Sequence, residues 1–142
     1  MFVQISIGAA ILMVSMIFSA AGFWLIESAL RHLNRYLAKL RQGLKVVIFL
    51  MVAALWALLQ ITVGVWIWAW CFMQLAVFET MEEAVYFGLV SYTTLGYGDV
   101  ILPEQWRLLG GMTAVNGLLN VGLISAIMIE LLRQARVVPI DD

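Results

Sequence analysis

A short run of threonine, glycine and tyrosine near the middle of the chain has the residue types of a cation path made from backbone oxygens. Residues 93–99 read Thr-Thr-Leu-Gly-Tyr-Gly-Asp. Gly96 and Gly98 adopt positive φ at little steric cost, so the backbone can alternate in hand along this run. Such a backbone aims successive carbonyl oxygens at one line, and rings of these oxygens can replace the water shell of a dehydrated potassium ion. The Thr94 hydroxyl can add an oxygen at one mouth, and Tyr97 can brace the path from behind.

The composition indicates a membrane protein. Of the 142 residues, 64% are hydrophobic and only 12% are charged, and the mean hydropathy is +1.00. A soluble domain of this length could not bury so much apolar surface. The net charge of −1 gives no reason to expect a nucleic-acid partner. The sequence lacks a metal-ligand cluster, a nucleophile–base set and a phosphate-binding glycine loop, so we expect neither an enzyme nor an organic cofactor.

Three segments are long and apolar enough to cross a hydrocarbon core of about 30 Å as helices. They cover residues 2–28, 46–70 and 108–132. Residues 81–92 would span only about 18 Å as a helix, too short to cross. They fit a pore helix that enters the membrane part-way and leads into residues 93–98, because non-helical backbone at membrane depth needs cover from protein or a watery cavity. The predicted fold is an all-α membrane protein with three transmembrane helices and a re-entrant pore helix.

The start of the short helix carries a capping signal. Thr80 followed by Glu83 matches a capping box, which predicts that the helix begins at Met81. Its carboxyl end, with a partial negative charge, would then favour a cation. Glu79, Glu82 and Glu83 either raise the cation concentration at the outer mouth or only cap the helix and stay solvated.

The basic residues predict the orientation in the membrane. The chain has eight lysines and arginines, and seven of them lie between the first two spans or after the third. They are Arg31, Arg35, Lys39, Arg41, Lys45, Arg133 and Arg136. The positive-inside rule makes both segments cytoplasmic, with the N-terminus and residues 97–99 outside and the C-terminus inside. Tryptophans near the outer ends of the spans either form an interfacial belt or pack between helices. These are Trp66, Trp68, Trp70 and Trp106.

Residues 46–132 resemble the pore module of bacterial potassium channels, which consists of an outer helix, a pore helix, a selectivity filter and an inner helix. The specificity of the resemblance rests mainly on residues 93–99. It implies a homotetramer with a central pore, and K⁺ as the transported ion. The implied filter residues are Thr93, Thr94, Leu95, Gly96, Tyr97 and Gly98. The K⁺ sites would lie at Thr94, Leu95, Gly96 and Tyr97.

The resemblance divides the chain into three parts. Residues 1–45 would form an additional transmembrane helix and a cytoplasmic amphipathic linker, residues 46–133 the pore domain, and residues 134–142 a short cytoplasmic tail. The additional helix lacks the arginine ladder of a voltage sensor. Leucines repeat through residues 28–45 opposite basic side chains, which favours a helix on the cytoplasmic membrane surface near anionic lipid.

The resemblance also implies that Asp99 bonds to a donor on the pore helix behind the filter. Tyr86 stands where many relatives carry tryptophan, so we predict a hydrogen bond between Tyr86 and Asp99. Val90 stands where some relatives have a buried carboxylate, so we expect no carboxyl–carboxylate pair there.

The third span carries polar residues and glycines that suit an inner helix. Thr113, Asn116 and Asn120 are spaced i, i+3 and i+7, so they share one helix face. That face lines either an aqueous cavity or an interhelical contact with hydrogen bonds. Gly117 and Gly122 are candidates for the mid-helix hinge that the family often has, or they let helices approach closely.

The predicted function is passive, potassium-selective conduction across the bacterial inner (plasma) membrane by a multi-pass channel. Two alternatives stay open, a weakly selective cation channel and a non-conducting modulatory or scaffold subunit.

Overall fold

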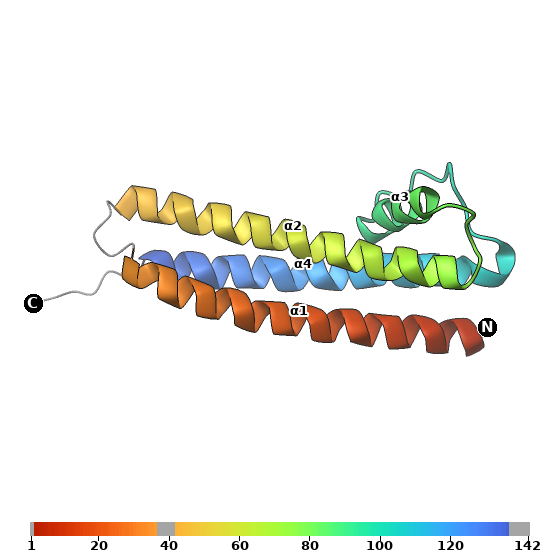
Figure 1. Ribbon diagram of the computed structural model, residues 1–142, viewed down its shortest axis with the longest axis horizontal. Helices are drawn as coiled ribbons and strands as arrows, with labels where there is room; N and C mark the ends of the chain where they lie inside the picture. Colours follow the sequence, from red (N-terminus) through yellow and green to blue (C-terminus); the bar gives the residue numbers. More distant parts are fainter. Residues whose placement is uncertain (1, 37–41, 137–142) are drawn as a thin grey trace, which may run out of the picture.

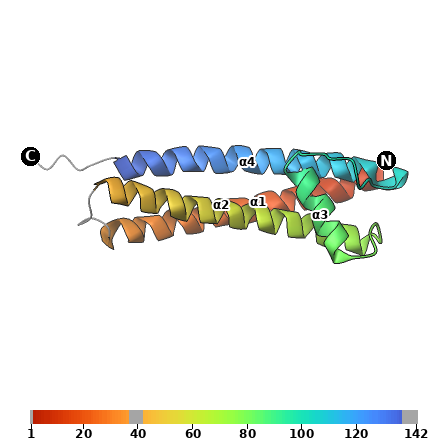
Figure 2. The ribbon, with the colours of Figure 1, turned by 90° about the horizontal axis from the view of Figure 1, so that it is seen from above.

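Three long helices form a bundle, and a fourth, shorter helix lies beside one end of it (Figure 1). The computed structural model describes residues 2–36 and 42–136. The long helices are α1 (Phe2–Tyr36), α2 (Gln42–Gln74) and α4 (Arg107–Arg136). Each contacts the other two, and α1 and α4 run parallel to each other and antiparallel to α2 (Figures 1 and 2).

The predicted spans are confirmed as helices. Within the described ranges, three helices are long and apolar enough to cross a membrane, and their apolar parts are Phe2–Ala29, Gln42–Gln74 and Glu104–Glu130. The turn before the last of them begins at Pro103, which precedes the 3₁₀ helix η2 (Glu104–Trp106) that leads into α4. Proline suits this position because its fixed φ and missing N–H are compatible with a helix start.

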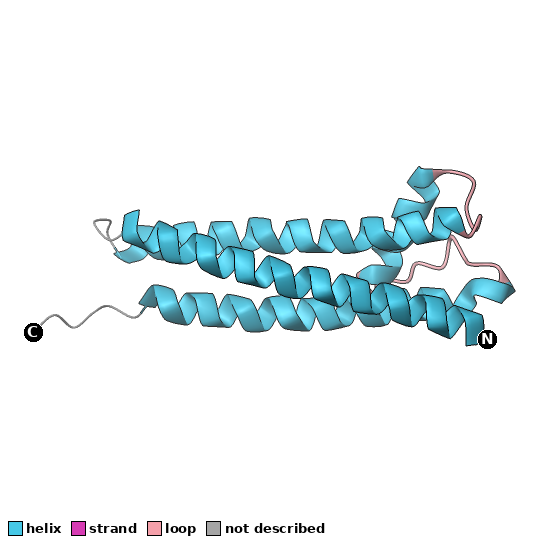
Figure 3. Ribbon diagram, turned by 60° about the horizontal axis from the view of Figure 1, so that its bottom comes forward, coloured by secondary structure: helices cyan, strands magenta, loops and turns pink. Residues whose placement is uncertain are grey.

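The short helix α3 (Met81–Tyr92) has the predicted bounds. It packs against α2 and α4, and the connections before and after it both lie at the same end of the bundle (Figure 3). The N-terminus of α1 lies at this end too, whereas α4 ends at the opposite end (Figure 1). The chain therefore enters and leaves the α3 region from one side of the bundle.

An aromatic cluster fixes α3 onto the bundle. The ring of Phe72 on α2 meets Phe78 edge-on at a centroid distance of 5.8 Å and Phe87 of α3 at 5.3 Å, both with interplanar angles of 82°. Edge-to-face pairs of this kind are each worth about 0.5–1.5 kcal/mol beyond the area they bury. Leu109 of α4 is fully buried in the same cluster. A second cluster, which includes Phe49, joins the three long helices toward the other end.

The predicted surface helix over residues 28–45 is wrong for its described part. Residues 28–36 continue α1 without a break, and α2 already begins at Gln42. The reason is local, because no glycine or proline lies between Gly22 and Gly43 to end the first helix. The remaining linker residues, 37–41, and the predicted tail after residue 136 lie outside the described residues.

The tryptophans of α2 do not all belong to one belt. Trp66 and Trp70 are 50% and 63% exposed, whereas Trp68 is fully buried in the cluster around Phe72. Residues two apart on a helix point in nearly opposite directions, so Trp68 must face inward when its two neighbours face outward. The belt interpretation is therefore wrong for Trp68, which packs between helices.

Candidate functional site

The backbone alternates in hand along residues 94–98. Thr94 has a φ of 60°, Gly96 of 60° and Gly98 of 76°, while Leu95 and Tyr97 between them keep negative φ. The glycines adopt this conformation freely. The β-branched Thr94 does so at a cost of about 1–2 kcal/mol, which the sequence did not reveal. Strain of this size persists only where surrounding contacts enforce it, and it is often found at functional sites.

Hydrogen bonds from this loop to the end of α3 hold the strained backbone in place. The N–H and the hydroxyl of Thr93 both donate to the Leu89 carbonyl, at 3.0 and 2.8 Å. The N–H of Thr94 donates to Ser91 at 2.9 Å. The N–H groups of Leu95 and Gly96 both donate to the carbonyl of residue 90, at 3.0 and 3.2 Å. The N–H groups of four consecutive residues, Thr93 to Gly96, therefore face the end of α3.

The loop is exposed in a single chain. All seven residues from 93 to 99 are exposed, with Leu95 at 57% and Tyr97 at 71%, whereas Tyr92 immediately before them is 1% exposed. Non-helical backbone is not stable against lipid, because its polar groups need partners. The backbone polar groups of the loop would therefore need a cover that a single chain does not provide.

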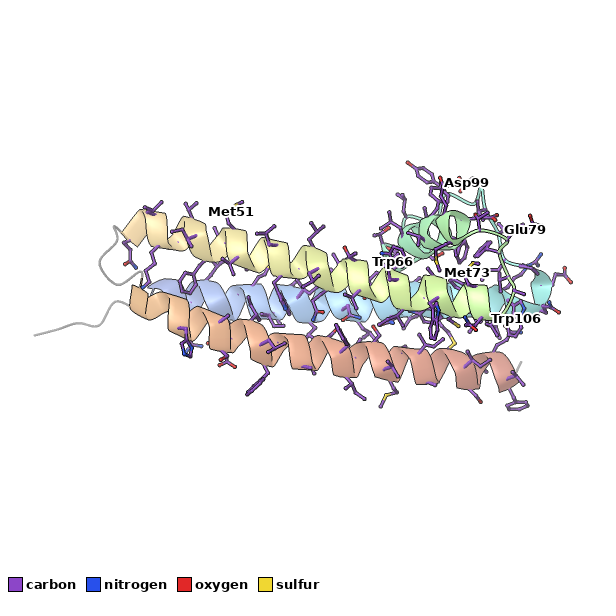
Figure 4. The ribbon with its side chains drawn as sticks, viewed as in Figure 1. Met51, Trp66, Met73, Glu79, Asp99 and Trp106 are labelled. Carbon is purple, nitrogen blue, oxygen red and sulfur yellow. The ribbon has the colours of Figure 1, made fainter. Side chains whose placement is uncertain are left out.

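Asp99 at the end of the loop is held by the pore-helix candidate as predicted. The Tyr86 hydroxyl donates to a carboxylate oxygen of Asp99 at 2.5 Å. This hydrogen bond lowers the pKa of Asp99 and raises the pKa of Tyr86, because it favours the ionised carboxylate and the protonated phenol. Figure 4 shows Asp99 over α3, on the side away from α1, at the end of the bundle where Glu79 and Trp106 also lie. In the place where the resemblance suggested a carboxylate, the Val90 side chain is buried.

The N-cap of α3 is Thr80, as predicted. The N–H of Glu83 donates to the Thr80 hydroxyl oxygen at 3.2 Å, and Thr80 has the extended backbone of an N-cap. Glu79 and Glu82 are exposed at the same end of the helix. Acidic residues in the first turn stabilise a helix through its dipole, so capping alone accounts for the acidic residues on α3.

The polar face of α4 does not line an open cavity. Thr113, Asn116 and Asn120 are at most 1% exposed within the single chain. Asn120 donates to Ser15 of α1 at 3.4 Å and to Asn116 at 2.9 Å, and it accepts a short bond from Ser19. The cavity-lining interpretation is therefore wrong, and the interhelical alternative is what the structure contains. The reason is α1, which covers the polar face of α4.

The two hinge candidates differ in their surroundings. A Cβ atom on Gly117 would lie 1.7 Å from the backbone oxygen of Tyr92, so this glycine permits direct contact between α3 and α4. A Cβ atom on Gly122 would meet nothing within 4 Å. Packing explains Gly117 without a hinge, while a hinge at Gly122 stays a prediction.

Sequence reasoning missed the partners of this polar face. They are Ser15 and Ser19 of α1, and the Ser19 carbonyl in turn accepts from Gln60 of α2. A signal was present, because Ser15 and Ser19 are spaced i, i+4 on one apolar helix, as Asn116 and Asn120 are on another. Polar pairs with matching spacing on two membrane helices indicate that the two helices pack against each other.

Comparison with protein families gives one match. A family model described as "Ion channel" matches residues 47–134, which include α3, the loop and nearly all of α2 and α4. Helix α1 lies outside the match. No curated protein and no solved structure matches the chain.

Proposed function

Because the chain belongs to the ion channel family, we propose that it is a potassium-selective channel with a filter built from residues 93–98 of four copies. The observation that carries the proposal is the alternating backbone, with positive φ at Thr94, Gly96 and Gly98. A ring of carbonyl groups needs a backbone of this kind. Two glycines adopt it freely, and Thr94 adopts it despite the strain.

The proposed mechanism is dehydration followed by movement between carbonyl rings. A K⁺ ion loses its water at the outer mouth and passes between sites formed by the backbone oxygens of residues 93–97. The Thr94 hydroxyl completes the innermost site. The sites lie at Thr94, Leu95, Gly96 and Tyr97, and K⁺ is the transported substrate. Several ions in the row repel one another, which keeps each from binding too tightly to leave.

Assembly into a homotetramer is supported by the exposure of the loop in one chain. Four copies around an axis would cover the non-helical backbone and bring the carbonyl groups together. Asp99 and its bond to Tyr86 would then support the outer end of each filter segment from behind.

The proposed placement makes α3 a re-entrant pore helix. Its carboxyl end points away from the end of the bundle that holds the N-terminus (Figure 1), so its partial negative charge would favour a cation in the inner half of the pore. The basic residues support an outside N-terminus and a cytoplasmic C-terminus in the bacterial inner membrane. They also support contact with anionic lipid around residues 28–45.

Flux from purified protein in liposomes tests the function. With opposing gradients of potassium and sodium, we expect K⁺ flux that far exceeds Na⁺ flux, and protein-free liposomes serve as the control. Equal Na⁺ flux would replace the proposal with a weakly selective cation channel. Absence of flux at every tested pH, voltage and membrane tension would favour a modulatory or scaffold subunit. The mass of the protein in detergent measures the number of copies independently.

A further inference from the structure

Tyr92 is the last residue of α3, directly before the loop, and it is clamped by two glycines. A Cβ atom on Gly64 of α2 would lie 2.4 Å from the Tyr92 hydroxyl oxygen. A Cβ atom on Gly117 of α4 would lie 1.7 Å from the Tyr92 backbone oxygen. The tyrosine therefore occupies the space that both glycines leave. Since Thr93 follows it in the chain, any shift of Tyr92 would also shift the first residue of the loop.

A polar cluster around Asn120 of α4 lies next to Tyr92. The Tyr92 backbone oxygen packs against Gly117, one helical turn before Asn120 on the same helix. The Tyr92 hydroxyl is fully buried and lies outside hydrogen-bond geometry with any described residue. A buried polar group with incomplete hydrogen bonding is costly to keep, so its position needs a reason beyond stability.

The polar cluster around Asn120 is linked to α1 by hydrogen bonds. Asn120 bonds to Ser15 and to Ser19, two residues one helical turn apart on α1. The Ser19 carbonyl accepts from the Gln60 side chain of α2 at 3.2 Å. Polar side chains in an apolar bundle fix the register of the helices that they join. The position of α1 along α4 is therefore set at the level of Tyr92.

Helix α1 is also fixed to α4 nearer the loop's outer end. The Gln4 side chain accepts from the N–H of Leu108, one of the free donors at the start of α4, at 3.3 Å. A Cβ atom on Gly8 would collide with the Met112 side chain at 2.3 Å. Two separated attachments make α1 a brace along the part of α4 against which Tyr92 packs.

We propose that α1 positions the inner end of the filter by holding α4, through the bonds of Ser15 and Ser19 to Asn120, where Gly117 packs against Tyr92. Ser15, Asn120 and Tyr92 are positioning residues in this proposal, because none of them touches the ion path. The proposal rests on the proposed function only for its effect on ions, since the placement of residues 93–96 can be measured without conduction.

Hydrogen exchange of the full-length protein tests the placement. The amides of residues 93–96 donate to carbonyls at the end of α3, so a loosened Tyr92 should expose them. In the variant Ser15→Ala/Ser19→Ala we expect exchange at residues 93–96 to rise about threefold to tenfold, the factor expected when an interhelical hydrogen bond in a membrane is lost. Exchange in the first turns of α3 should stay unchanged, which separates a local effect from global unfolding.

Thr62→Val is the matched control. The Thr62 hydroxyl donates only to the Leu58 carbonyl of its own helix, at 2.8 Å, so exchange at residues 93–96 should match that of the unaltered protein. Asn120→Ala is the second test variant. It removes the α4 partner of both serines, and it serves if the serine variant does not fold.

Unchanged exchange at residues 93–96 in both the serine variant and Asn120→Ala would overturn the proposal. Faster exchange in Asn120→Ala with an unchanged, folded serine variant would overturn the role of α1. In liposomes we expect the ratio of K⁺ to Na⁺ permeability to fall by a similar factor in the serine variant and not in Thr62→Val. If the unaltered protein does not select K⁺, the proposed function fails, while the exchange result still decides whether α1 positions the loop.

Discussion

The loop of residues 93–99 and the polar cluster around Asn120 place polar groups in an apolar protein in opposite ways. In the loop the polar groups belong to the backbone, and every residue is exposed in the single chain. In the cluster they belong to side chains, and Asn116 and Asn120 are at most 1% exposed. The two regions are neighbours, since Tyr92 packs against Gly117, one helical turn from Asn120, and Thr93 begins the loop.

This difference distinguishes polar groups whose partners lie in the same chain from polar groups whose partners would lie in other subunits. Side chains of α1, α2 and α4 satisfy most of the cluster within the chain. The carbonyl groups of residues 93–98 accept no backbone hydrogen bond from the described residues outside helices. The cluster therefore acts as support within one chain, and in the proposed channel the loop would be completed by other copies and an ion. Four experiments test this division, beginning with the loop.

Gly96→Ala should have the largest effect. Gly96 has a φ of 60°, in the left-handed region. A residue with a side chain is destabilised there by about 1–2 kcal/mol, and this penalty recurs in each copy. A return to negative φ would turn a carbonyl away from the ion path. We expect K⁺ flux in liposomes to fall by about tenfold or more, because 1.4 kcal/mol already corresponds to a factor of ten.

Gly43→Ala is the control for this experiment. It lies in α2, and an added Cβ atom would meet nothing within 4 Å, so the flux should be unchanged. Equal K⁺ flux in Gly96→Ala and in the unaltered protein would mean that the alternating backbone is not needed for conduction.

Gly117→Ala tests the support that the cluster side gives to the loop. Its Cβ atom would lie 1.7 Å from the Tyr92 backbone oxygen, and backbone cannot move aside as a flexible side chain can. Overpacking of this kind typically costs about 1–3 kcal/mol, so we expect a lower unfolding midpoint in detergent and reduced K⁺ flux.

Gly122→Ala is matched to it on the same helix. Nothing lies within 4 Å of the added atom, and alanine in place of glycine in a helix gains about 0.5–1 kcal/mol. We expect the unfolding midpoint to hold or rise. A large loss of stability in Gly122→Ala, or none in Gly117→Ala, would contradict the assignment of Gly117 to packing. A loss of flux in Gly122→Ala without loss of stability would support the hinge.

The sequence predicted best those features that depend on near neighbours. The bounds of α3 followed from Thr80 and Glu83, because a cap and its donor are three residues apart. The alternating loop followed from its glycines, and both features depend on chemistry that is complete within one short segment. The bond from Tyr86 to Asp99, which joins residues 13 apart in the chain, followed instead from the resemblance to potassium-channel pore modules.

Features that depend on which helix covers which face were predicted less well. The shared face of Asn116 and Asn120 was recognised, but its partner on α1 is about 100 residues away in sequence, with Ser19 and Asn120 separated by 101 positions. For Trp68 the sequence left an interfacial position and packing between helices both open, since periodicity does not say what lies opposite a helix. The positive φ of Thr94 was missed because residue type alone disfavours it.

Tyr86→Phe tests the outer support of the loop and should have a smaller, pH-dependent effect. The bond from Tyr86 lowers the pKa of Asp99 and raises the pKa of Tyr86. A lowered carboxyl pKa means that the bond contributes stability above the ordinary Asp value of about 3.9 and loses it as the pH falls through the lowered pKa. A raised phenol pKa means that the contribution is lost only above the ordinary Tyr value of about 10.

We therefore expect the midpoint of acid unfolding, measured by circular dichroism in detergent, to move to a higher pH in Tyr86→Phe. Asp99→Asn and the double variant complete the comparison, because the effect of Tyr86→Phe should be largely absent when Asp99 is already neutral. An acid midpoint identical in Tyr86→Phe and the unaltered protein would show that the bond does not support Asp99.

Thr80→Ala should have the smallest effect, and it tests whether α3 depends on its cap or on its packing. The cap satisfies one N–H, that of Glu83, and its loss typically costs about 1 kcal/mol. The aromatic cluster around Phe72 and Phe87 still holds α3 against α2, so the residues that end in the loop should keep their places. We expect a slightly lower unfolding midpoint with unchanged K⁺ selectivity, and Thr80→Ser should restore the midpoint because serine caps as well. A marked loss of selectivity in Thr80→Ala would mean that the loop is positioned from the start of α3, which would shift the main support away from Tyr92 and the polar cluster at its other end.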